Sequence, residues 1–152
     1  MNKTHDEIPL GWHPHLNGGG LVGGTAYVSE TVYVGPDAKV YGNAMVTGNS
    51  KVTGNALIYG NAWVYGNAWV YGNAWVYGNA QVFGDAEVFG NVVIYGNAKV
   101  YGRATVWGYS KIYENAKVYG NANVSGDDRL HDFSVSIWVF LSDVEYQQLR
   151  TI

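Results

Sequence analysis

The sequence contains no cysteine. Disulfide frameworks, thiolate metal sites and a cysteine nucleophile are therefore excluded. Charged residues make up 14% of the chain, whereas about 25% is usual for a soluble protein. The formal net charge is −3, which argues against an electrostatic nucleic-acid partner, because such proteins usually carry a basic domain.

Long apolar segments are also missing. No stretch approaches the roughly 18 apolar residues of a membrane-spanning helix, and residues 1–21 lack the apolar core of a secretory signal. We therefore expect a cytoplasmic protein without a membrane partner. A chain of 152 residues is long enough to bury a core of its own and favours a single domain.

What the chain has in abundance is a six-residue repeat. The phrase Tyr-Gly-Asn-Ala-Trp-Val occurs three times in succession, at 59–64, 65–70 and 71–76. Around it, a β-branched aliphatic residue stands at every sixth position from Val22 to Val124, eighteen anchors without an insertion or deletion. A small residue, usually Ala, stands two positions before all but two of the anchors, where Val32 and Val92 take its place. Such strict periodicity predicts a repeat architecture.

Each hexapeptide is interpreted as one short strand and one corner. A spacing of two places the small residue and the anchor on the same, core-facing side of a strand. The Gly-Asn pairs that follow favour a corner, because both residues tolerate positive φ. Near-identical units imply coils stacked in parallel, which is a solenoid. The pattern leaves open whether three strands close a triangular coil or two strands close a flat one.

This pattern resembles the hexapeptide-repeat proteins over about residues 20–126. The resemblance implies an all-β fold, a left-handed parallel β-helix of about six triangular coils, and a homotrimer as the usual assembly. The chain departs from the family by having Tyr or Phe directly after most anchors, where the family often has a small residue. We therefore expect an N-terminal cap over 1–21, the β-helix over 22–126, and a C-terminal strand–helix unit over 127–152 that caps the coils or assembles subunits.

Both ends depart from the repeat. Trp12 is expected to cover the first coil. Alternating residues over 133–141 predict one strand, and Ser142 or Asp143 is a suitable N-cap for a short helix over 144–150. Open solenoid ends expose strand edges, so capping segments are expected there.

In a triangular solenoid, residues 18 apart stack along the outside. The aromatic residues after the anchors would then form ladders that stabilise the fold, or a contact surface for a partner. The corner asparagines Asn43, Asn61, Asn79, Asn97 and Asn115 would form a further ladder. Asp85 and Arg103 lie one coil apart in another corner column, within reach of pairing. The candidate contact residues for a protein partner or a second copy are Trp63, Trp69, Trp75, Trp107, Phe133, Trp138, Phe140 and Tyr146.

Enzymatic members of the family use histidines that this chain lacks. The acyltransferases use a His general base near a subunit boundary, and the γ-class carbonic anhydrases hold zinc with three His. No His occurs between residues 22 and 124, and the four in the chain are His5, His13, His15 and His131. We assign no catalytic residue, metal or cofactor. The remaining enzymatic hypotheses are a trimer-boundary acyltransferase using His131 or the N-terminal His, a metal held by His13 and His15, and acid–base chemistry by His131 with Asp132.

The chain also resembles bacterial and prophage proteins in which Val-Tyr-Gly-Asn-Ala repeats follow an Asn-Gly-Gly-Gly segment. Residues 17–20 and 41–44 carry that resemblance. We predict a non-enzymatic, rigid β-solenoid that binds a protein partner or its own copies, and a phage- or prophage-encoded inhibitor of a host protein fits such a scaffold. The alternatives are the acyltransferase-like enzyme and glycan binding on the surface aromatics.

Overall fold

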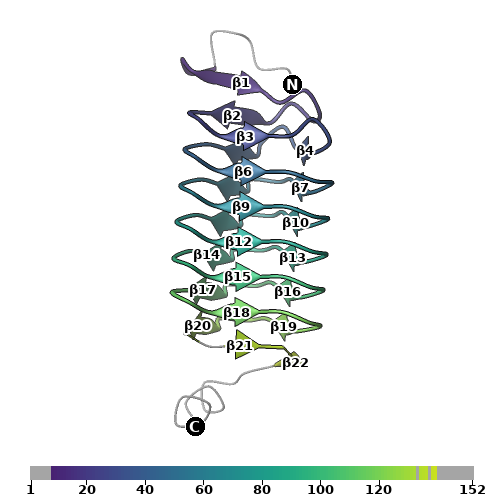
Figure 1. Ribbon diagram of the computed structural model, residues 1–152, viewed down its shortest axis with the longest axis vertical. Helices are drawn as coiled ribbons and strands as arrows, with labels where there is room; N and C mark the ends of the chain where they lie inside the picture. Colours follow the sequence, from purple (N-terminus) through teal and green to yellow (C-terminus); the bar gives the residue numbers. More distant parts are fainter. Residues whose placement is uncertain (1–7, 133, 137, 140–152) are drawn as a thin grey trace.

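The computed structural model describes residues 8–132, 134–136 and 138–139, which form a three-sided parallel β-solenoid (Figure 1). The near strands in Figure 1 run from left to right as the chain descends, and the chain returns behind them, so the coil is left-handed. The all-β architecture expected from the repeat is confirmed, and so are the triangular coils that the family resemblance implied. The described residues contain no helix of the length and apolar character needed to cross a bilayer.

Every third strand belongs to the same sheet. The first sheet contains β1 (Trp12–Pro14), β2 (Leu21–Gly23), β5 (Lys39–Val40), β8 (Leu57–Ile58), β11 (Trp75–Val76), β14 (Val93–Ile94), β17 (Lys111–Tyr113) and β20 (Arg129–His131). The second sheet contains β3 (Tyr27–Val28), β6 (Met45–Val46), β9 (Trp63–Val64), β12 (Gln81–Val82), β15 (Lys99–Val100), β18 (Lys117–Val118) and β21 (Ser134–Val135). The third sheet contains β4 (Tyr33–Val34), β7 (Lys51–Val52), β10 (Trp69–Val70), β13 (Glu87–Val88), β16 (Thr105–Val106), β19 (Asn123–Val124) and β22 (Trp138–Val139).

The core is a narrow column of alternating Ala and Val or Ile side chains. In the hexapeptide around β10, Ala68 and Val70 are both fully buried, whereas Trp69 between them is 41% exposed. This alternation follows from the period of two in a strand. The six coils predicted between residues 22 and 124 are present. Small and β-branched side chains fill their interior, so a binding site is expected on the outer surface.

Neighbouring coils are joined by regular backbone hydrogen bonds. In the central coils, the amide of Trp69 donates to the carbonyl of Ala86 over 2.9 Å, and the amide of Tyr71 donates to Val88 over 2.9 Å. The same spacing recurs in the corner, where the Asn73 amide donates to Gly90 over 2.8 Å. The backbone donors of a coil are therefore satisfied by the next coil.

The corner glycines are required both by their backbone angle and by the closeness of the next coil. Gly108 has φ +80°, and a Cβ built on it would lie 2.7 Å from the carbonyl oxygen of Gly126 in the following coil. Gly126 has nearly the same φ, +79°, but a Cβ there would meet none of the described residues within 4 Å. Only the first of these positions therefore carries a steric constraint in addition to the conformational one.

The N-terminal end is covered by a strand of opposite direction. Strand β1 pairs antiparallel with β2, and the Trp12 ring lies 5.4 Å from that of Tyr41, so Trp12 covers the first coil as expected. A Cβ on Gly23 would lie 2.4 Å from the Trp12 ring, so the indole packs directly against the backbone of Gly23. His15 is buried behind this strand, and its Nε2 donates to the carbonyl of Val32 over 3.0 Å.

The C-terminal segment differs from the single strand expected over 133–141. Its extended residues form β21 and β22, which belong to different sheets and add to a seventh coil. Val135 pairs with Val118 and Val139 with Val124, spacings of 17 and 15 residues instead of 18. The seventh coil is thus shorter than the others and lies outside the strict repeat frame. The helix expected over 144–150 falls outside the described residues.

Candidate interface on the solenoid surface

The three tryptophans of the identical repeats occupy three different faces. Trp63, Trp69 and Trp75 lie in β9, β10 and β11 and belong to the second, third and first sheets. Their exposed fractions are similar, at 45%, 41% and 44%. Because they surround the solenoid in consecutive strands, they do not form one patch. A partner that docks on one face therefore meets only one of them.

The third-face tryptophans are engaged by the fold itself. The Nε1 of Trp69 donates to the Thr53 hydroxyl over 3.3 Å, and the Lys51 Nζ lies 5.7 Å from its ring centroid, a cation–π contact. The Nε1 of Trp107 donates to the Asn123 side-chain oxygen over 2.8 Å. These partners explain both indoles without a ligand.

Trp63 and Trp75 have fewer internal partners. Trp63 meets the Tyr65 ring edge to face, with centroids 6.3 Å apart, and lines a surface hollow of about 250 Å³ together with Met45, Thr47 and Tyr65. Trp75 lies in register between Leu57 and Val93 of the neighbouring strands. Among the described residues, no ring contact or side-chain hydrogen bond involves Trp75.

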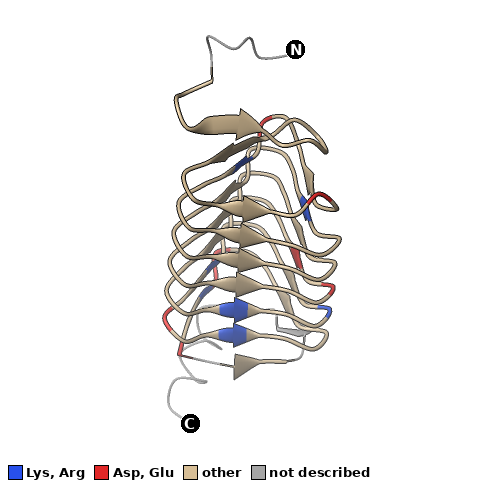
Figure 2. Ribbon diagram, turned by 45° about the horizontal axis from the view of Figure 1, so that its top comes forward, with Lys and Arg blue, Asp and Glu red and all other residues tan. Residues whose placement is uncertain are grey.

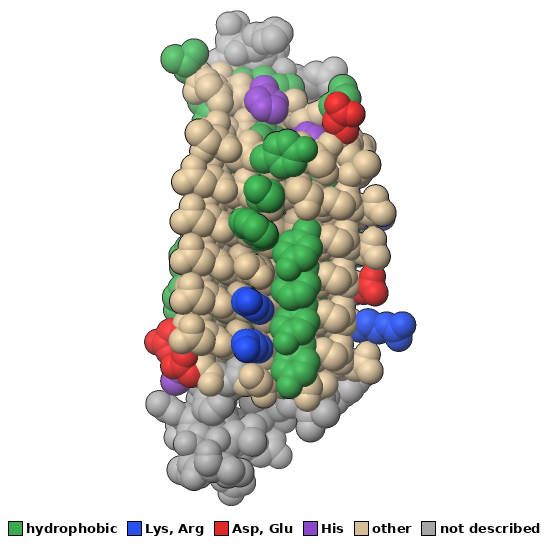
Figure 3. Space-filling view, viewed as in Figure 1, with side chains coloured by type: hydrophobic (Ala, Val, Ile, Leu, Met, Phe, Trp, Pro, Cys, Tyr) green, Lys and Arg blue, Asp and Glu red, His purple; other side chains and the backbone are tan. Residues whose placement is uncertain are grey.

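The second face changes from apolar to basic along the solenoid axis. Its outward column runs in register from Tyr27 through Met45, Trp63 and Gln81 to Lys99 and Lys117. Figure 3 shows this face, with the two lysines beside a column of aromatic rings, and Figure 2 shows the basic residues on two consecutive strands.

Lys99 and Lys117 are direct neighbours in the parallel strands β15 and β18. Within the described part of the chain, neither forms an ion pair with a carboxylate, since the ion pairs found there belong to His131. Like charges opposite each other on paired strands are destabilising. The pair therefore gives the fold no stabilising contact, and its charge is available to an acidic partner.

The aromatic ladders are confirmed, and they stabilise the fold. Neighbouring rings are nearly parallel, with interplanar angles of 1° to 11° and most centroids 4.7 to 5.3 Å apart. Since the interior rings have neighbours on both faces, they expose edges. A sugar that stacks on a ring face cannot do so on these rings, which removes the support that the ladders gave to glycan binding.

Stacking also changes the acidity of the tyrosines. Burial raises the pKa of Tyr41, Tyr59, Tyr65 and Tyr95 above the ordinary value. Burial also raises the pKa of Tyr71, whose hydroxyl donates to the Glu87 carboxylate over 2.5 Å.

An alkaline titration is expected to show this shift. A raised pKa means that the folded chain holds its phenolic protons more tightly than the unfolded chain. The stabilising contribution is complete below about pH 10, the pKa of a free tyrosine, and is lost as the pH rises through the higher values of the folded state. Tyrosinate absorbance of the native protein should therefore rise at a higher pH than that of the guanidinium-unfolded protein, and coincident curves would contradict the prediction.

The corner asparagines form the expected ladder. The Nδ2 of Asn61 donates to the Oδ1 of Asn79 over 3.3 Å, and the same contact recurs along the column as far as Asn115. The expected pairing of Asp85 with Arg103 is wrong. The Asp85 carboxylate accepts a hydrogen bond from Asn67 over 2.9 Å instead, and the described residues contain no ion pair between Asp85 and Arg103.

The histidines lie at opposite ends of the solenoid. His13 belongs to β1 and His15 follows it, whereas His131 ends β20, so the structure does not bring the two groups together in one chain. The His15 Nε2 donates to the Val32 carbonyl, so only its Nδ1 could take part in metal binding. An acyltransferase site between subunits stays an untested prediction.

The C-terminal candidates are only partly described. Trp138 begins β22, where it pairs with Asn123. Phe133, Phe140 and Tyr146 lie outside the described residues. One polar group that sequence reasoning missed is Glu114, which approaches His131 and Asp132. The available signal was its position in the repeat, because Glu114 stands where most coils have Gly and lies one coil before Asp132.

The fold and its repeat define the class: the chain is a parallel β-solenoid repeat protein. It is similar to the YdcK beta solenoid repeat, which matches residues 38–54, 56–72 and 62–78. No curated protein matches the chain. The matched residues span strands β5 to β11 and include Trp63 and Trp75.

Proposed function

We propose that the protein is a rigid, non-enzymatic binding module that holds a protein partner on its second face. The observation that carries the proposal is the exposed Trp63 beside a hollow, in register with Lys99 and Lys117, which form no ion pair with any described residue. Tryptophan dominates binding energy at many protein interfaces. An inhibitor of a host protein is one use of such a module.

The arrangement specifies the chemistry of the partner. Trp63 and Lys99 are separated by one intervening strand, β12, which places them about 10 Å apart along the axis. A matching partner would carry an apolar side chain that fills the hollow of about 250 Å³. It would also carry carboxylates about 10 Å from that side chain, where they reach the lysines. The carboxylates would neutralise the repulsion between the lysines, a gain that exists only in the complex.

The solenoid suits this role because its face is already ordered. Every described strand of the second sheet is held by hydrogen bonds to its neighbours. Binding to such a surface avoids the entropy of ordering a loop. The face spans seven strands, about 29 Å from first to last at 4.8 Å a strand.

The test uses the three identical repeats as matched controls. Binders are selected from a displayed peptide library on the full chain, and their affinities are measured for four single variants. Trp63→Ser is expected to weaken binding at least tenfold, whereas Trp75→Ser and Trp69→Ser, on the other faces, leave it unchanged. Lys99→Glu is expected to weaken acidic binders and to reduce their salt dependence. Binders equally sensitive to all three tryptophans, or to none, would contradict the proposal.

Self-assembly is a second candidate, favoured by the first face. Trp75 stands in register between the apolar Leu57 and Val93, a stripe that a second copy would bury. Absolute mass by light scattering distinguishes the two functions. A trimer that dissociates in Trp75→Ser but persists in Trp63→Ser would assign the first face to assembly, and a monomer at all concentrations would remove this candidate.

A further inference from the structure

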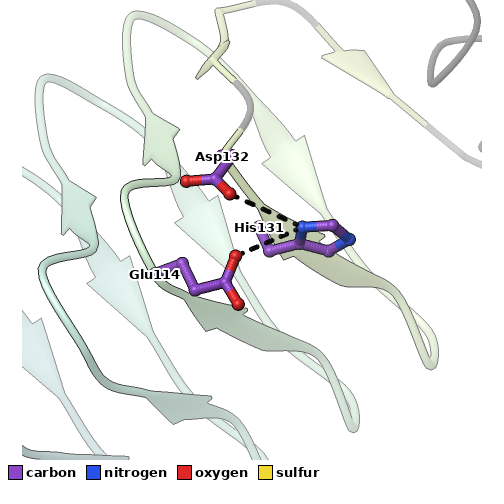
Figure 4. A group of neighbouring side chains, drawn as sticks. All are labelled: Glu114, His131 and Asp132. Carbon is purple, nitrogen blue, oxygen red and sulfur yellow. Dashed lines mark ion pairs between the residues drawn. The ribbon is translucent and has the colours of Figure 1, made fainter.

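Three metal-binding side chains converge at one corner of the solenoid. Glu114 follows β17, His131 ends β20 and Asp132 is the next residue, so the group joins two successive coils (Figure 4). The His131 Nδ1 lies 3.4 Å from the Glu114 Oε2 and 4.0 Å from the Asp132 Oδ2. One ligand atom from each residue lies within 4.8 Å of the others.

The backbone holds both carboxylates over the same corner. Glu114 and Asp132 have φ of 55° and 53°, and they are the only non-glycine residues of the described chain with positive φ. They replace the glycine found at this corner in the five preceding coils, Gly24, Gly42, Gly60, Gly78 and Gly96. The result is a side-chain cluster at a corner that elsewhere has none.

Neighbouring groups fix the orientation of two of the three side chains. The Asn115 Nδ2 donates to the Asp132 Oδ1 over 3.0 Å, and the other oxygen, Oδ2, faces His131. The His131 ring stacks on Tyr113, with centroids 5.3 Å apart, and so ends the tyrosine ladder. Such outer contacts are typical of metal sites.

We propose that Glu114, His131 and Asp132 form a site for a divalent cation of the Zn²⁺ type. Zinc binds imidazole nitrogen and carboxylate oxygen at about 2.0–2.2 Å, so its ligand atoms lie about 3.0–3.5 Å apart. The 3.4 Å between His131 and Glu114 meets that requirement, and the Asp132 Oδ2, 4.0 Å from the same nitrogen, would have to move closer to become the third ligand. One imidazole with two carboxylates favours zinc over calcium, which takes oxygen ligands.

The test is a calorimetric titration of the chelator-treated full chain with ZnCl₂. We expect one ion per chain with a micromolar dissociation constant. Glu114→Gly should weaken binding at least tenfold without harming the fold, because it restores the glycine of the repeat. Glu30→Gly is the matched control, since Glu30 is the other glutamate at a glycine position of the repeat and lies far from His131. His13→Gln controls for binding at the N-terminal histidines.

A spectroscopic measurement tests metal binding independently of the calorimetric titration. Co²⁺ bound by one nitrogen and two carboxylate oxygens gives visible absorption bands, which His131→Gln should abolish and His13→Gln should preserve. Melting curves without metal verify that each variant is folded. Absence of saturable Zn²⁺ binding would show an ion pair only and overturn the proposal. Equal affinity in Glu114→Gly, or loss in His13→Gln alone, would also overturn it.

Discussion

Replacing Gly108 by alanine is expected to destabilise the protein far more than the same change at Gly126. The two residues lie in one corner column with φ of +80° and +79°, so both substitutions meet the left-handed strain of about 1–2 kcal/mol. At Gly108 the new Cβ would also lie 2.7 Å from the next backbone carbonyl. Separating two coils costs about 1–3 kcal/mol more, by analogy with overpacked cores.

Denaturant unfolding of the two variants measures this difference directly. Gly126→Ala serves as the control because it has the same residue change and almost the same φ, but no atom of the described residues within 4 Å of the new Cβ. A difference of about 1 kcal/mol or more supports a steric role for the stacked corners. Equal losses would show that φ alone explains the glycines.

Truncating a core anchor is expected to have the other large effect. Ile94 in β14 is fully buried and belongs to the single core column. Ile94→Ala leaves a cavity that the surrounding coils cannot fill, because each backbone position is fixed by hydrogen bonds to both neighbours. Buried Ile→Ala changes cost about 2–5 kcal/mol.

The adjacent residue provides the control. Val93 belongs to the same strand but faces outward and is half-buried, so Val93→Ala is expected to cost less than about 1 kcal/mol. Thermal melting of both variants checks the contrast. Similar melting temperatures of the two variants would mean that the core residues rearrange to fill the cavity, which would contradict the prediction.

The regular part of the fold could be predicted because nearly every repeat places a small residue and a β-branched anchor on the core side of a strand. Val70 and Ala68 mark the core side of one strand, and seventeen further anchors repeat the pattern without a gap. The register then follows from the 18-residue coil, which also predicts the aromatic and asparagine ladders. A single hexapeptide would not define the fold, whereas many hexapeptides at a constant spacing indicate stacked coils.

The departures from the repeat were harder to predict. The alternation over 133–141 is compatible with one long strand and also with two short strands separated by a corner. Because this segment has no Gly-Asn pair, the sequence gives no sign of the corner. Asp132 takes the positive φ that glycine supplies elsewhere, a role that composition does not reveal. Asp85 and Arg103 share a column, but the Asn67 amide provides the carboxylate with a closer hydrogen-bond partner. Local competition of this kind is not encoded in spacing.

The uniform stacking of coils makes the protein a molecular ruler. Each interior strand pairs only with the strands 18 residues before and after it, so adding or removing 18 residues changes the height by one strand spacing, about 4.8 Å, without rotating the faces. The three identical repeats at 59–76 contain one such unit. Duplication of that unit would move the lysine ladder one step further from Met45, and the reach of the molecule can therefore evolve in discrete increments while its cross-section is conserved.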